Sequence, residues 1–262
     1  MRSAFLDAVA ERVVVYDGAT GTWIQTQDLT ADDYGGPALE GCTDILGVTR
    51  PDVVAALHSA YFDVGADVVE TNTFGAFAIP LGEYGIPERA YEISAAAASV
   101  ARQTVDEYVA RDGRARFVAG SMGPGTKIAT LGQVSYPDLV AAYRDQASGL
   151  IDGGADLLII ETQFDLLCAK AAMIACRRAM AAVGREVPLQ VQVTMEMTGR
   201  MLLGTEIGAA LGSLQAMRPD VLGINCATGP AEMSEHLRHL SAHAPMPLSC
   251  IPNAGMPWVV DG

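Results

Sequence analysis

The sequence lacks a long hydrophobic run and a basic cluster. No stretch of about 18 uncharged apolar residues occurs, and Met1 to Arg12 alternates charged with small apolar side chains where a signal peptide would be apolar. We therefore expect a cytoplasmic protein that does not contact a membrane. The 17 Lys and Arg face 31 Asp and Glu, for a formal net charge of −14. That charge would repel a phosphate backbone, which excludes nucleic acid as an expected partner.

Paired cysteine motifs are also lacking. Cys42, Cys168, Cys176, Cys226 and Cys250 are odd in number, widely spaced and include no CxxC pair, which indicates reduced thiols in a chain without an export signal. Cys168 and Cys176 fall in an alanine-rich helical stretch and are expected in the core. Cys226 ends an expected strand and is a candidate metal ligand or nucleophile, although no histidine base ends any expected strand.

What the chain does contain is a regular alternation of strand-like and helical segments. It has 262 residues, half of them hydrophobic, enough to bury one sizeable core. Apolar runs that end in polar or glycine residues are expected to be strands, at 13–16, 67–69, 117–120, 157–160, 189–193, 221–224 and 248–251. Between them lie amphipathic helical stretches, at 51–64, 88–111, 136–152, 166–183, 207–217 and 230–242. This order predicts right-handed βαβ units and a parallel sheet covered on both faces.

A weak internal repeat narrows the fold. The segment GADVVET at 65–71 returns as GADLLIIET at 154–162, and the later units are spaced at about 30 residues, one eighth of a typical barrel. We predict an α/β fold, a (β/α)8 TIM-type barrel whose last β/α unit is absent from this chain. The strands at 13–16 and 248–251 would then be open edges. An open α/β sheet is the alternative.

Polar residues gather where the expected strands end, and these ends form the active face in barrels and open α/β sheets alike. They are Asp17, Glu70, Asn72, Ser121, Glu161, Thr194, Asn225, Cys226 and Asn253. Asp17 and Glu161 could act as a general acid and base or could jointly bind a cation such as an ammonium group. The glycines at 18 and 21 would let backbone amides approach a small anion, but no nucleotide-binding motif is matched.

Seven ordered motifs resemble the homocysteine S-methyltransferase family, closest to members that form the N-terminal homocysteine-binding barrel of cobalamin-dependent enzymes. They are DGATGT at 17–22, TRPDVV at 49–54, ETNTFG at 70–75, GSMGP at 120–124, GRML at 199–202, GINC at 223–226 and PNAG at 252–255. The resemblance implies methyl transfer to homocysteine, giving methionine, with zinc holding the substrate as a thiolate. Zinc binding lowers a thiol pKa that is otherwise near 8.5.

The resemblance also implies roles for individual residues. Cys226 matches a zinc ligand and is the catalytic candidate, and Asn253 would occupy the open zinc position. Asp17 and Glu161 match the carboxylates that hold the substrate ammonium group. The remaining candidates line the substrate pocket or offer amides to the substrate carboxylate, namely Gly18, Ala19, Gly21, Thr22, Asn72, Ser121 and Asn225.

The family's other two zinc ligands are adjacent cysteines in a Gly-Gly-Cys-Cys-Gly motif that these 262 residues do not contain. We therefore expect residues 1–262 to be a homocysteine-binding barrel domain truncated at its C-terminus, which binds zinc weakly or not at all. The implied donor is methylcobalamin, supplied from methyltetrahydrofolate, and both donors would bind separate modules of the same or a partner chain. One alternative is a cobalamin-independent enzyme that uses S-methylmethionine or S-adenosylmethionine. Another is a non-catalytic binding or docking barrel.

Overall fold

The central feature of the computed structural model, which describes residues 3–254, is one parallel sheet. Its strands follow one another in space in the order of the sequence, and every neighbouring pair is parallel. They are β1 (Val68–Glu70), β2 (Phe117–Met122), β3 (Leu157–Gln163), β4 (Leu189–Val193), β5 (Val221–Asn225) and β6 (Leu248–Ile251). Because sequential parallel neighbours need a crossover, a helix covers the outside between one strand and the next.

The helices are α1 (Ala4–Glu11), α2 (Thr20–Gln25), α3 (Leu46–Thr49), α4 (Pro51–Asp63), α5 (Ala78–Leu81), α6 (Ala90–Asp112), α7 (Tyr136–Asp152), α8 (Leu166–Val183), α9 (Ile207–Gln215) and α10 (Pro230–His243). Local sequence fixes several of their ends. Asp165 caps α8 by accepting a hydrogen bond from the Leu167 amide, and Gly184 ends the same helix in a left-handed conformation.

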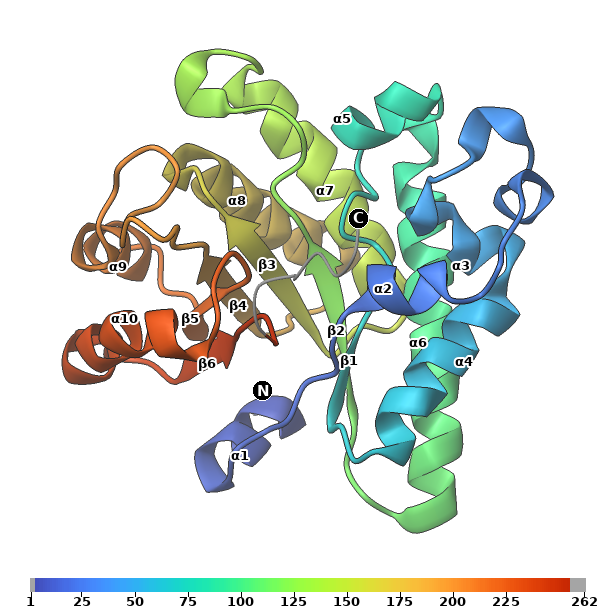
Figure 1. Ribbon diagram of the computed structural model, residues 1–262, viewed down its shortest axis with the longest axis horizontal. Helices are drawn as coiled ribbons and strands as arrows, with labels where there is room; N and C mark the ends of the chain where they lie inside the picture. The colour runs from blue at the N-terminus through green and yellow to red at the C-terminus, as the bar shows by residue number, and fades with distance from the viewer. Residues whose placement is uncertain (1–2, 255–262) are drawn as a thin grey trace, which may run out of the picture.

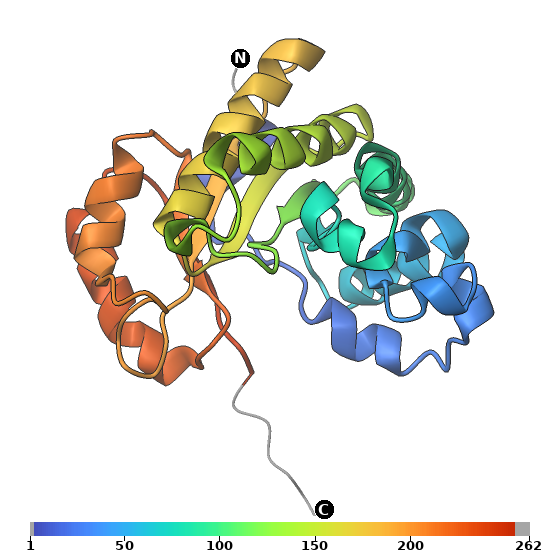
Figure 2. The ribbon, with the colours of Figure 1, turned by 90° about the horizontal axis from the view of Figure 1, so that it is seen from above.

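The sheet curls into a half-barrel with its helices on the outside (Figures 1 and 2). Seen from above, the ring of elements is open between the α9–α10 side and the α2–α4 side. The expectation of an α/β fold with a parallel sheet and outer helices is therefore confirmed. What the described residues form is consistent with a truncated TIM-type barrel, whereas a complete (β/α)8 barrel is not established.

The expected first strand at 13–16 is not a regular strand. Only Tyr16 forms a β-bridge, to Val68, and the Val15 carbonyl accepts hydrogen bonds from the Asp67 and Val68 amides. The opposite edge of this segment faces open space, and Val13 is 85 % exposed. With a partner on one side only, the segment is extended without forming a ladder.

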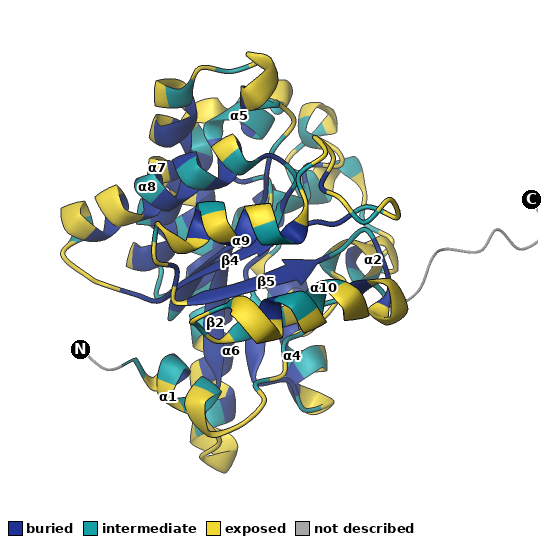
Figure 3. Ribbon diagram, turned by 90° about the vertical axis from the view of Figure 1, so that its left-hand side faces the viewer, coloured by how far each residue is buried: buried dark blue, intermediate teal, exposed yellow. Residues whose placement is uncertain are grey.

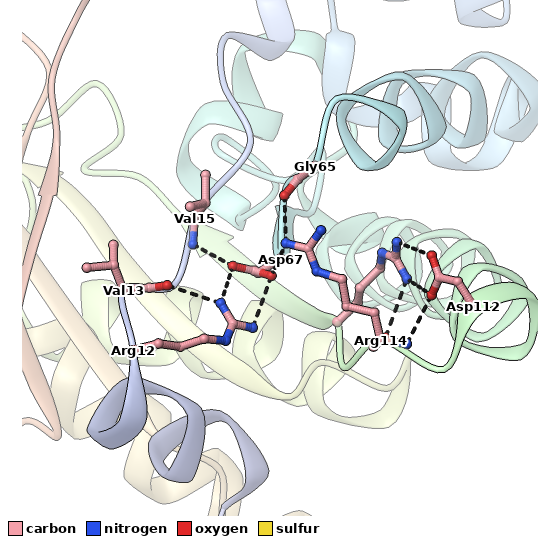
Figure 4. A network of polar contacts seen from close by, with 8 residues as sticks. Arg12, Val13, Val15, Gly65, Asp67, Asp112 and Arg114 are labelled. Atoms are coloured by element: carbon pink, nitrogen blue, oxygen red, sulfur yellow. Dashed lines mark hydrogen bonds and ion pairs between the residues drawn. The ribbon is translucent and has the colours of Figure 1, made fainter.

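Asp67 attaches this N-terminal segment to the sheet at the end opposite the strand termini that carry the polar residues. Its buried carboxylate accepts two hydrogen bonds from Arg12, one from Arg114 and one from the Val15 amide (Figure 4). The donors lower the pKa of Asp67 below its usual value, although burial alone would raise it. One carboxylate therefore joins α1, the extended segment and the loop before β2.

The core lies between the sheet and its helices, where β1 to β5 are buried along almost their whole length (Figure 3). The edge strand β6 is only partly buried. Cys168 and Cys176 are fully buried there, as expected. Small residues bring α6 and α7 close together: a Cβ added at Gly149 would lie 2.5 Å from the Tyr91 carbonyl oxygen. Within residues 3–254, no helix is long and apolar enough to cross a membrane.

A groove of about 950 Å³ separates the N-terminal segment from β6. Its walls include residues 12–17 on one side and 247–252 on the other, and Phe5, Gln190 and Val221 also line it. Both walls are therefore edges of the sheet that carry no β partner on this side within the described residues, and these are the two edges that the sequence analysis expected to be open.

Candidate functional site

One cavity of about 710 Å³ lies at the carboxyl ends of the strands. Every candidate residue from the sequence lines it, namely Asp17, Gly18, Ala19, Gly21, Thr22, Asn72, Ser121, Glu161, Asn225, Cys226 and Asn253. Gly255, the last residue of the PNAG motif, lies outside the described residues. Of the polar residues grouped at the expected strand ends, Thr194 does not line the cavity, because it is buried and donates to the Asn225 carbonyl. The other members of that group line it, and their individual roles stay predictions.

Asp17 and Glu70 stand next to each other on the cavity wall. The Glu70 amide donates a 2.9 Å hydrogen bond to Asp17 Oδ2, which fixes the aspartate side chain. Asp17 Oδ1 and Glu70 Oε1 are buried and have no hydrogen-bond partner among the described residues. Burial raises the pKa of both carboxyl groups well above their usual values, and the nearby Glu161 raises both further.

Glu161, by contrast, is surrounded by donors. Ser121 Oγ donates to its Oε1 at 2.6 Å, while Asn225 Nδ2 and Thr162 Oγ1 donate to its Oε2 at 3.0 and 3.3 Å. Burial still raises the pKa of Glu161, and the three hydrogen bonds oppose that effect because they favour the ionised form. Glu161 is therefore a positioned carboxylate whose two oxygens are both occupied by protein donors.

Asn225 connects this carboxylate to the thiol of Cys226. Its Oδ1 accepts from the Thr162 amide at 2.7 Å, and its Nδ2 lies 3.4 Å from Cys226 Sγ. Thr162, Cys226 and Ala227 all have positive φ, at 56°, 57° and 58°, a left-handed conformation that costs free energy in non-glycine residues. Strained backbone at the ends of β3 and β5, which flank β4, places the Cys226 thiol beside Thr162 Oγ1, at 3.7 Å.

The Cys226 thiol does not belong to a complete metal site within the described residues. In residues 3–254, no group of three His, Cys, Asp or Glu side chains is arranged to hold a metal ion. Cys250 Sγ instead contacts Met233 Sδ at 3.8 Å, and Cys42 is buried in a separate cluster. Burial raises the pKa of Cys226, so the free thiol is mostly protonated at neutral pH. A structural or catalytic zinc needs three or four protein ligands, and the donors described here do not fit it.

A second part of the wall comes from the loops after β1 and before α3. Asn72 Nδ2 donates to the Thr43 carbonyl at 2.6 Å. Asp44 accepts a 2.9 Å hydrogen bond from the Gly75 amide, and burial raises its pKa to about 6. These contacts hold the loop that carries Asn72 against the 3-10 turn at Thr43–Ile45.

The glycine-rich segment at 18–22 runs along the cavity into α2. A Cβ added at Gly18 would lie 3.0 Å from the Tyr61 hydroxyl oxygen, so the absence of a side chain permits this close approach. The segment therefore lines the cavity edge, and binding of a small anion by its amides stays a prediction.

The charge of the cavity is of one sign. Four carboxyl side chains line it, from Asp17, Asp44, Glu70 and Glu161, and the described lining residues include no Lys, Arg or His. A wall of this kind favours a cationic ligand and repels a purely anionic one.

Three residues at this site were not among the sequence candidates. Glu70 was noted as a strand-end residue without a role, and Asp44 lies two residues after Cys42 in a loop with no assigned function. Thr162 follows Glu161 directly, but its left-handed backbone and its contact with Cys226 leave no mark in the sequence.

The chain resembles known proteins in family, sequence and structure. The profile of one family, described as Homocysteine S-methyltransferase, matches residues 14–262. A protein of Mycobacterium tuberculosis (strain ATCC 25618 / H37Rv), named methionine synthase, is 53 % identical over 252 residues, and that of Mycobacterium leprae (strain TN) is 52 % identical. Both alignments cover 96 % of this chain, which spans only 21 % of the length of either relative.

Solved structures show the same fold. The metallated form of the homocysteine methyltransferase MmuM from Escherichia coli superimposes with a TM-score of 0.78 at 23 % identity, covering 96 % of this chain and 86 % of that one. The apo form of the same enzyme gives a TM-score of 0.73 at 21 % identity, covering 97 % and 86 %. At these identities the likeness establishes the arrangement of the chain and nothing finer.

Proposed function

This chain belongs to the homocysteine S-methyltransferase family, and from that premise we propose that it binds homocysteine as the methyl acceptor of an enzyme that makes methionine. The observation that carries the proposal is the single cavity at the strand ends, where acidic side chains and the Cys226 thiol face the same space. An amino acid with a thiol side chain presents the complementary groups, namely an ammonium, a carboxylate and a sulfur atom. We further propose that residues 1–262 form the homocysteine-binding domain.

In this proposal, different residues of the cavity wall bind different groups of the substrate. Asp17 and Glu161 attract the ammonium group, and Ser121 and Asn225 favour the ionised form of Glu161 by donating to it. The amides at the start of α2 receive the carboxylate, with Gly18, Ala19, Gly21 and Thr22 as the candidates. The substrate sulfur then lies toward Cys226.

We also propose that the site binds zinc, provided that further ligands complete it. Cys226 is the thiolate ligand that this chain contributes, and Asn253 lines the same cavity. Because zinc sites need at least three protein ligands, zinc requires two further ligands from outside the described residues. When bound, zinc supplies the charge that favours the thiolate over the thiol.

For the methyl donor we propose methylcobalamin, recharged from methyltetrahydrofolate, on modules separate from this domain. Two observations support separate modules: relatives named methionine synthase are about five times longer than this chain, and the loops above the sheet expose apolar side chains that would suit docking. These side chains follow β1 to β4 and are Phe74, Leu131, Leu167, Met197, Leu202 and Leu203.

Two other readings make different predictions. A cobalamin-independent methyltransferase would form methionine from S-methylmethionine or S-adenosylmethionine without added cobalamin. A non-catalytic barrel would bind homocysteine but transfer no methyl group from any donor. The incomplete metal site within residues 3–254 is the observation that favours the second of these readings. Zinc content measured together with the intact mass distinguishes a non-catalytic barrel from a zinc enzyme. The cytoplasmic location remains a prediction from sequence.

Titration of the 262-residue chain with L-homocysteine tests the substrate. We expect binding that weakens about 10-fold or more in Asp17→Asn, because a charged hydrogen-bond acceptor for the ammonium group is lost. Asp32→Asn serves as the control, since Asp32 is exposed and does not line the cavity. Absence of homocysteine binding by the wild-type chain, or equal binding by both variants, would contradict the proposal.

A further inference from the structure

Glu70 is the carboxylate that the proposed function leaves without a role. It ends β1 and lines the cavity, and its Oε1 is buried without a hydrogen-bond partner among the described residues. A buried polar atom normally has a partner, because the desolvation cost is otherwise uncompensated. An unfilled acceptor in a cavity wall therefore indicates a donor that arrives with the ligand.

The neighbouring Asp17 also has a carboxylate oxygen without a hydrogen-bond partner among the described residues. Asp17 Oδ2 is held by the Glu70 amide at 2.9 Å, while Asp17 Oδ1 has no partner within residues 3–254. Two unfilled carboxylate oxygens thus belong to residues joined by one hydrogen bond. Glu161 differs, because Ser121, Thr162 and Asn225 already donate to both of its oxygens.

The acidic lining of the cavity favours a cationic donor for these acceptors. The charged and titratable groups that act on Glu70 are Asp17, Glu161 and Cys226, all of which raise its pKa, and Tyr16, whose own pKa is raised by Glu70. None of these groups supplies positive charge, and the described cavity lining contains no Lys, Arg or His. A primary ammonium group has both the charge and enough N–H donors to fill two acceptors and to remain near Glu161.

We propose that Glu70, together with Asp17, binds the substrate ammonium group by accepting hydrogen bonds from it. Glu161 contributes negative charge near the ammonium group, but its two oxygens already accept hydrogen bonds from protein donors. This inference rests on the proposed function and sharpens it. The site selects thiols that carry a free primary ammonium group, and it discriminates against the same thiols when that group is absent.

The test compares L-homocysteine with 4-sulfanylbutanoate, which has the same carbon chain and thiol but no ammonium group. Affinities of both ligands for the 262-residue chain are measured by ligand-observed NMR for the wild type, Glu70→Gln and Glu186→Gln. Glu186 is an exposed residue before β4, at the opposite end of the sheet, and is the matched control. We expect Glu70→Gln to weaken L-homocysteine binding about 10- to 100-fold and to leave 4-sulfanylbutanoate binding within about two-fold.

The ratio of the two affinities separates binding from a merely structural role. If Glu70→Gln weakens both ligands equally, or neither of them, the inference is overturned while the proposed function stands. If the wild type binds no homocysteine, the proposed function fails and the inference fails with it. Glu70→Asp, which keeps the charge on a shorter side chain, is expected to retain part of the selectivity, and it provides the same comparison if Glu70→Gln does not fold.

Discussion

The hydroxyl group of Tyr16 donates a 2.8 Å hydrogen bond to Oε1 of Gln190, and this contact links the N-terminal segment to β4 on the inner side of the curled sheet. Gln190 Nε2 in turn donates to Ser249 Oγ in β6 at 3.1 Å. These three side chains therefore connect the two edges that border the groove. The open side of the half-barrel is bridged by hydrogen bonds between side chains rather than between strands.

Tyr16→Phe is expected to lower the free energy of unfolding by about 1–3 kcal/mol, because it leaves the buried Gln190 oxygen without a donor. Denaturant titration measures the change. Tyr91→Phe is the matched control, since the Tyr91 hydroxyl bonds Asp152 on the surface and its loss should cost no more than about 0.5 kcal/mol. Equal effects of the two variants would show that the bridge contributes nothing specific.

Asp67→Asn is expected to destabilise the fold by about 2–4 kcal/mol, since a buried carboxylate with two arginine partners is replaced by a neutral amide. Because the pKa of Asp67 is lowered in the folded state, its contribution is present above the unfolded value of about 3.9 and is lost as the pH falls through the folded value.

The control for this change is Asp145→Asn, which breaks an exposed ion pair with Arg144 and should change stability by no more than about 1 kcal/mol. Unfolding of the two variants is compared at pH 7 and at pH 3. A loss in Asp67→Asn that is as large at pH 3 as at pH 7 would argue against the electrostatic explanation.

His58 makes stability depend on pH in weakly acidic solution. Its ring is fully buried in α4, neither nitrogen has a partner among the described residues, and burial lowers its pKa from 6.5 to about 4. The unfolded chain therefore takes up a proton that the folded chain excludes. Stability is full above pH 6.5 and falls as the pH drops toward 4, by at most about 3 kcal/mol from this group.

His58→Leu should remove this acid-dependent loss and be close to neutral at pH 7, because leucine needs no hydrogen bond. Thermal unfolding between pH 4 and 7 gives the difference between variant and wild type, which cancels the contributions of carboxyl groups such as Asp44. His243→Gln alters an exposed histidine and should follow the wild-type profile. Parallel profiles for His58→Leu and the wild type would refute the assignment.

The groove between the N-terminal segment and β6 should promote self-association, since open β edges pair readily with other chains. Light scattering over a range of protein concentrations is expected to show species larger than a monomer. Val13→Lys, on the exposed edge, should reduce them, whereas Val64→Lys should not. Val13 and Val64 are 85 % and 82 % exposed, which makes them a matched pair. A monomer at every concentration would mean that the edges are protected.

The periodic segments of the fold could be predicted because burial controls them directly. The bounds of α7, α8, β4 and β6 agree with those expected from the sequence. The segment at 13–16 was apolar enough for a strand, but a ladder depends on partners, and only Tyr16 has a bridge. Helix α1 was not predicted, since it has eight residues and no side-chain cap at Ser3.

The site followed from topology rather than from single residues. Parallel strands place their carboxyl ends together, so Asp17 and Cys226 could be grouped although they are far apart in sequence. Which oxygen accepts from which donor could not be predicted, because those contacts depend on backbone angles such as the positive φ of Thr162. The pairing of Asp17 with the Glu70 amide is of the same kind.

The strand order β1 to β6 also determines how the chain is assembled during translation. Within residues 3–254, each strand of the sheet pairs only with its neighbours in sequence. A strand that leaves the ribosome therefore meets an earlier partner that has already been synthesised. The cavity is different, because its wall runs from Asp17 to residues after β6. The scaffold can therefore fold progressively during synthesis, whereas the ligand site is completed only after the last of these units has emerged.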